Sequence, residues 1–122
     1  MSVFNLLNAL PEVTTAEVSE AVVTGQGVRL ERIVSLGQAS PEGFWYDQVD
    51  AEWVMVLCGK ARLAIAGEHQ ERELGPGDAI FLEAHCRHRV TWTAPDQPTV
   101  WLALFVDPEL ALCPSGPMKE SK

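Results

Sequence analysis

The chain has 122 residues, an apolar fraction of 47% and a formal net charge of −8. This length and composition predict one globular domain and exclude a disordered chain. The negative charge opposes binding to nucleic acid and acidic lipid. No stretch approaches the roughly 20 apolar residues that cross a bilayer. The N-terminus also lacks the pattern of a signal peptide, so we expect a cytoplasmic protein.

The three cysteines, Cys58, Cys86 and Cys113, are widely spaced and form no C-x-x-C motif. This pattern predicts free thiols in a reducing compartment. The sequence contains no phosphate-binding loop, dinucleotide fingerprint or nucleophile elbow.

The first 26 residues predict an arm and an edge. Apolar residues at positions 3, 4, 6, 7, 9 and 10 indicate a short helical turn or an arm lying on a core, which Pro11 ends. Residues 12–23 alternate weakly and suggest an edge strand. Gly25 and Gly27 predict a turn.

Short strands dominate the rest of the chain. In residues 28–36, Val28 and Leu30 alternate with Arg29 and Glu31, and the phase breaks near Arg32, which predicts a bulge. A tail over residues 108–122 is expected to be mobile. About eight strands with turns every 8–12 residues predict a sandwich or barrel. The expected strands cover residues 28–36, 44–48, 52–58, 61–66, 70–74, 79–82, 87–93 and 99–106.

Two partial motifs within this β region resemble those of the cupin superfamily. Glu52, six residues and Gly59 match the E-x6-G half of the first motif, and Gly77 and His88 have the separation of the second. The resemblance implies an all-β jelly-roll barrel (a double-stranded β-helix) over residues 27–107. Residues 1–26 would form the N-terminal arm and edge.

The family's metal ligands are only partly present. Its two first-motif histidines fall on Tyr46 and Gln48 with a three-residue spacer, or on Trp45 and Asp47 with a four-residue spacer. Only one of these pairs can point inward from a strand. The resemblance implies two alternatives for the site. Gln48, Glu52 and His88 hold one divalent metal ion, or Glu52 and His88 form a buried hydrogen-bonded pair without metal.

A ligand pocket is therefore expected at Tyr46, Gln48, Glu52, His88 and Trp92, because His88 and Trp92 share a strand face with Val90. Three functions stay open: an enzyme acting on a small molecule, a non-catalytic metabolite sensor or binding protein, and an accessory protein with a degenerate metal site.

The apolar arm and the family's pairing habit together predict a homodimer.

Overall fold

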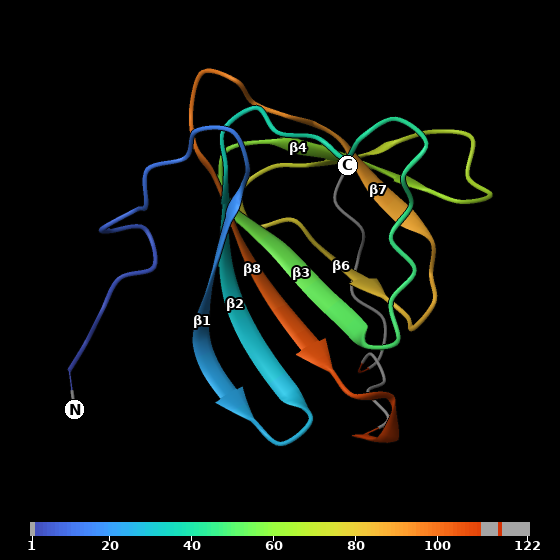
Figure 1. Cartoon of the computed structure of the whole chain (residues 1–122), viewed down its shortest axis with the longest axis horizontal. Helices are drawn as coiled ribbons and strands as arrows, with labels where there is room; N and C mark the ends of the chain where they lie inside the picture. The colour runs from blue at the N-terminus through green and yellow to red at the C-terminus, as the bar shows by residue number, and fades with distance from the viewer. Residues whose placement is uncertain (1, 111–114, 116–122) are drawn as a thin grey trace.

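A computed structural model describes residues 2–110 and 115, and its secondary structure is nearly all β (Figure 1). Every strand pairing is antiparallel. The predicted all-β fold is confirmed. The elements are β1 (Val18–Gly25), β2 (Val28–Ser35), β3 (Ala51–Cys58), β4 (Ala61–Ile65), β5 (Arg72–Leu74), β6 (Ala79–Leu82), β7 (His88–Thr93), β8 (Thr99–Val106) and a 3-10 helix, η1 (Pro108–Leu110).

The strands form two sheets with the arrangement of a jelly-roll barrel. The larger sheet has the order β1-β2-β8-β3-β6 and the smaller has the order β5-β4-β7. Figure 1 shows β1, β2, β8 and β3 side by side, with β4 and β7 packed toward one end of them. Apolar side chains from both sheets meet in one core: Val54, Val56, Ala61, Leu63, Leu74, Leu82, Trp101, Ala103 and Phe105.

The charged face of β2 points into the barrel. Glu31 pairs with Ala103 of β8, which is fully buried in the core, and paired residues share one face of a sheet. The predicted bulge near Arg32 is wrong, because β2 pairs with β8 without a break. The irregularity lies in β1, between Ala21 and Val23. As an edge strand β1 has one neighbour, so it can absorb an extra residue.

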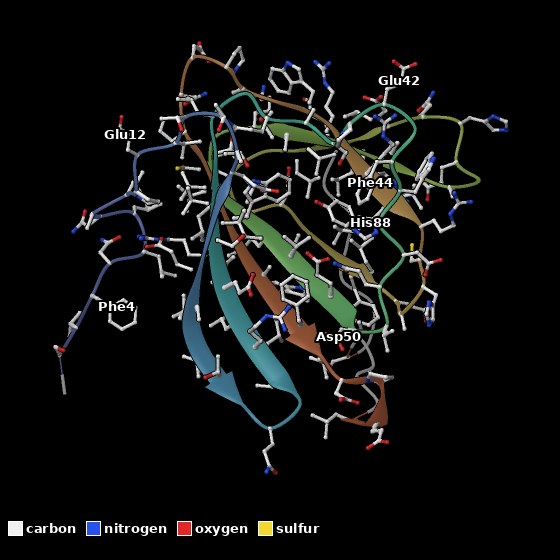
Figure 2. The ribbon with its side chains drawn as sticks, in the orientation of Figure 1. Phe4, Glu12, Glu42, Phe44, Asp50 and His88 are labelled. Carbon is white, nitrogen blue, oxygen red and sulfur yellow. The ribbon has the colours of Figure 1, made fainter. Side chains whose placement is uncertain are left out.

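The N-terminal segment is an arm, without helix in the described residues 2–10. Arg32 ties it to the sheet by donating hydrogen bonds to the carbonyls of Leu6, Asn8 and Ala9. Val3 and Phe4 are 99% and 68% exposed, and Figure 2 shows Phe4 on the arm, outside the barrel.

The C-terminal tail begins with η1. The rest of the expected mobile tail, including Cys113 but not Ser115, lies outside the described residues. Cys58 and Cys86 are free thiols, as predicted. Among the described residues, no helix has the length and apolar character needed to cross a membrane.

Candidate functional site

A cavity of about 190 Å³ lies between the two sheets. Four residues predicted from the sequence, Tyr46, Gln48, Glu52 and His88, line it together. The volume is below the roughly 300–1,000 Å³ of typical drug-sized sites, so it suits a small molecule. The remaining lining residues are Glu17, Ser19, Glu31, Ile33, Val54, Leu63, Leu82, Val90, Trp101 and Phe105.

Glu52 contributes a buried carboxyl group to this cavity. It lies near the start of β3 between Leu82 and Phe105, and the residue is only 8% exposed. No hydrogen bond to its side chain exists among the described residues. Desolvation first, and then repulsion by Glu31 and Glu17, raise the pKa of Glu52 to about 7, against a smaller opposing effect of Arg29. The group is therefore able to gain or lose a proton near neutral pH.

His88 faces Glu52 from the opposite sheet, at the start of β7. Its Nδ1 donates a hydrogen bond to the carbonyl of Cys86 at 2.8 Å, because a carbonyl oxygen can only accept. The other ring nitrogen, Nε2, lies 3.8 Å from Oε1 of Glu52. The ring stacks on Tyr46 with centroids 5.3 Å apart and planes at 22°. The backbone and Tyr46 thus fix the ring with Nε2 toward the carboxyl group (Figure 2 labels His88).

Tyr46 and Gln48 are the inward pair of their segment, which resolves the alternative left open by the sequence. Residues 44–48 do not form the predicted strand, because only Tyr46 bridges to His88. Trp45 lies beside Arg87, with the guanidinium 5.5 Å from the ring centroid, and Asp47 pairs with His85 at 2.7 Å. Neither Trp45 nor Asp47 lines the cavity.

The phenol of Tyr46 remains a hydrogen-bond donor at neutral pH. Desolvation first, and then the carboxylates of Glu17 and Glu52, raise the pKa of Tyr46 above its ordinary value.

Trp92 lies outside the cavity, contrary to the expectation from strand alternation. Leu63 pairs with Val90 but Arg62 pairs with Trp92, so one extra residue in β7 shifts the phase. Trp92 consequently packs under the guanidinium of Arg62, 4.7 Å from its ring centroid. The alternation of side chains along β7 correctly predicts that Val90 faces the cavity. It gives the wrong face for Trp92, which follows the bulge.

Sequence reasoning missed two acidic residues of the site, Glu17 and Glu31. The alternation in β2 separated Glu31 from Val28 and Leu30, and an apolar face is normally the inner one. Glu17 precedes β1 in a segment with weak alternation. It stands at the cavity rim, where the hydroxyl of Ser35 donates to its carboxylate at 3.5 Å. Desolvation raises the pKa of Glu17 despite that hydrogen bond.

The donors around the cavity do not fit a transition-metal centre. No group of three or more His, Cys, Asp or Glu residues that could hold a metal ion occurs in residues 2–110. Beside His88 the cavity offers the amide of Gln48, the phenol of Tyr46 and the carboxyl groups of Glu17, Glu31 and Glu52, and these do not gather into such a group. Imidazole-rich sets hold such metals well, and this set has one imidazole.

Comparison with known proteins now defines the family. The family model described as the cupin domain matches residues 34–105. The chain belongs to the cupin family. This membership agrees with the partial motifs of the sequence and with the jelly-roll arrangement of the two sheets.

Solved structures support the same fold. A protein from Ralstonia eutropha JMP134, provisionally named mannose-6-phosphate isomerase, is 44% identical, with a TM-score of 0.84 over 88% of this chain and 99% of that one. A cupin superfamily protein from Desulfitobacterium hafniense DCB-2 has 15% identity and a TM-score of 0.65, covering 80% and 84%. A Cupin 2 conserved barrel domain protein from Salinispora arenicola CNS-205 has 19% identity and a TM-score of 0.63, covering 90% and 92%. Among curated proteins there is no match.

Two motif positions of this cupin show why the family pattern requires glycine. Gly59 has a φ of +91°, and a Cβ there would lie 2.5 Å from the Thr99 backbone. The inner glycine of the second motif is His85 here, and His85 keeps a positive φ of 62°. Its amide donates to the carbonyl of Gln48 at 2.7 Å, so this strained loop helps to hold a cavity residue.

Proposed function

We propose that this cupin binds a small organic molecule in its barrel cavity and that Glu52 and His88 exchange a proton with it. One observation carries the proposal: a carboxyl group with a pKa of about 7 is buried without a hydrogen-bond partner beside the free Nε2 of a fixed imidazole. Burial of such a group costs stability, so its retention favours a functional use.

The pair suits proton transfer, in which one group donates and the other accepts. A general acid or base works best when its pKa lies near the working pH, and Glu52 meets this condition. Tyr46 and Gln48 supply a hydroxyl and an amide that orient the bound molecule. A non-catalytic sensor would use the same contacts for binding alone, and it is the second candidate because the metal donors are degenerate.

The provisional name of the Ralstonia protein suggests a phosphorylated sugar as substrate. The electrostatics of this cavity disfavour that substrate. Its lining contains three glutamates and no Lys or Arg, so a phosphate dianion would meet repulsion without a cationic partner. We expect mannose 6-phosphate to leave the melting temperature unchanged.

A melting-temperature screen against small metabolites tests the proposed function, because a molecule that binds the native state raises the midpoint. Ser19→Phe places a ring at the exposed rim of the cavity, and Thr24→Phe adds the same ring to β1 away from it. A ligand of the cavity stabilises the wild type and Thr24→Phe but not Ser19→Phe. Stabilisation of all three proteins alike, or no stabilising compound at all, would count against the proposal.

We also propose that the cupin pairs as a homodimer through its arm. The side chains of Val3, Phe4 and Leu7 are exposed. Val3 and Phe4 line one groove with residues 20–22 of β1, whose outer edge has no strand neighbour among the described residues. Exposed apolar side chains next to a free strand edge favour association with a second copy.

A further inference from the structure

We infer that the molecule held in this cavity carries a positive charge and is a small organic cation such as a primary or substituted ammonium ion. This inference rests on the proposed binding function and adds the chemical class of the ligand. It comes from the charge of the cavity wall, from the absence of a hydrogen bond to the Glu52 side chain among the described residues and from the aromatic side chains that line the same cavity.

Three carboxyl groups from separate parts of the chain border the same cavity, with Glu17 at its exposed rim. Glu17 precedes β1, Glu31 lies on β2 and Glu52 lies on β3, and all three line the cavity. Among the described residues, Arg29 donates from its Nε to Glu31, and His88 lies beside Glu52 with its Nε2 3.8 Å from Oε1. Arg29 lies over the ring of Phe105, 4.4 Å from the centroid, and does not itself line the cavity. Arg29 therefore compensates Glu31 directly and Glu52 only in part, because desolvation and the repulsion by Glu31 and Glu17 on Glu52 outweigh its effect.

The buried member of this group, Glu52, has one ion-pair partner among the described residues, His88, whose Nε2 lies 3.8 Å from Oε1. Glu52 is 8% exposed and accepts no hydrogen bond among the described residues. Buried charges are normally paired, because an unpaired one costs several kcal/mol. Repulsion from Glu31 and Glu17 adds to that cost. A cation in the cavity offsets both penalties and supplies a second ion-pair partner for Glu52 beside His88.

The rest of the wall distinguishes an organic cation from a metal ion. Tyr46, Trp101 and Phe105 line the same space, and aromatic rings attract ammonium groups while also contacting their alkyl substituents. Trp101 is held in place because its Nε1 donates to Ser35 at 3.1 Å. A strongly hydrated metal ion gains little from such walls, and the described part of the chain contains no group of metal-ligating residues. The chain's net charge of −8 also attracts cations over longer distances.

A matched pair of probes tests the charge of the ligand at constant shape: tert-butylammonium and tert-butanol. Binding is followed by chemical-shift changes of the Trp101 indole and of amides lining the cavity, at about pH 8, where Glu52 is ionised. We expect the ammonium ion to bind the wild-type protein at least about tenfold more tightly than the alcohol. Glu52→Gln should remove this preference, whereas Glu71→Gln, which removes an exposed charge outside the cavity, should keep it.

A second readout is independent of affinity. The ammonium ion favours ionised Glu52, so its binding near pH 7 should release a proton, and calorimetry in two buffers of different ionisation enthalpy detects this release. The groups that face Glu52 are Glu17, Glu31 with Arg29, His88 and Tyr46. Glu52→Gln should lower the proton release.

The outcomes separate the charge of the ligand from the binding function. Equal affinity of both probes for the cavity overturns the cationic ligand and leaves the proposed binding function standing. No ammonium binding at tens of millimolar overturns the inference, and the metabolite screen then decides the function on its own. If Mn²⁺ alone shifts the same signals and displaces tert-butylammonium, the cavity takes a metal ion and the organic cation is wrong.

Discussion

The Nε2 atom of His88 lies 3.8 Å from Oε1 of Glu52, and neither atom has a hydrogen-bond partner among the described residues. The separation is too long for a direct hydrogen bond. The two side chains therefore face each other across the cavity without a direct hydrogen bond between them. This relationship favours a site that is completed by a ligand over a finished structural pair.

Glu52 should make the stability of the fold depend on pH. Its pKa rises from an ordinary value of 4.5 to about 7 in the folded chain, so between these values the folded state holds a proton that the unfolded state has lost. Stability therefore falls as pH rises through this window, and the cost is fully present above it. Urea unfolding should show Glu52→Gln to be more stable than wild type by about 2–3 kcal/mol at about pH 8 and similar at about pH 4.

The exposed substitution Glu71→Gln is the control, with an effect within about 0.5 kcal/mol at both pH values. An equal effect of Glu52→Gln at both pH values would contradict the raised pKa.

The glycine of the first motif offers a test of backbone and steric constraint together. Gly59 and Gly67 have φ values of +91° and +89°, but only at Gly59 would a Cβ collide, with Thr99 and the Pro98 carbonyl. Gly67→Ala should cost about 1–2 kcal/mol from backbone strain alone. Gly59→Ala should cost at least about 2 kcal/mol more or prevent folding, measured by chemical denaturation. Similar losses for both variants would refute the close-contact explanation.

The residues that line the cavity predict how much metal the purified protein contains. Protein purified without added metal should contain well under one equivalent of Fe, Mn, Ni or Zn, because the cavity has one imidazole and its carboxyl groups do not gather into a metal-binding set among the described residues. Treatment with a chelator should leave the melting temperature unchanged. Near-stoichiometric metal, lost together with stability on chelation, would contradict the account and restore Gln48, Glu52 and His88 as ligands.

The sequence predicted the strands and the centre of the site because both follow from local patterns. Strand alternation and the spacing of Glu52, Gly59, Gly77 and His88 located two of the four predicted residues that line the cavity. The three-residue spacer correctly favoured Tyr46 and Gln48.

The missed features depend on tertiary structure. The bulge in β7 that turns Trp92 outward leaves no mark in a regular alternation, and strand phase alone does not say which face of β2 is inside. The sequence pattern therefore did not predict Glu31 as a site residue, although Glu31 lines the cavity. The positive φ of His85 could not be predicted from the sequence, because glycine is the usual sign of such a backbone conformation and this position is a histidine.

Oligomeric state is tested through the arm. Light scattering at micromolar concentration should give about twice the chain mass of 13.4 kDa. Replacing Val3 and Phe4 together by Ser should shift the protein toward the monomer, because both exposed side chains lose their apolar contact. Thr24→Ser, on the exposed end of β1, is a control that should keep the dimer. A wild-type mass near 13.4 kDa would rule out the homodimer.

The cavity should hold Glu52 as a carboxyl group that changes protonation near neutral pH. Carbon-13 NMR of the glutamate side-chain carboxyl groups, with the Glu52 signal assigned by its loss in Glu52→Gln, measures this directly. We expect a titration midpoint for Glu52 of about 7. A midpoint close to the ordinary 4.5 would contradict it, since the carboxylate would then be solvated or paired and not held for a ligand.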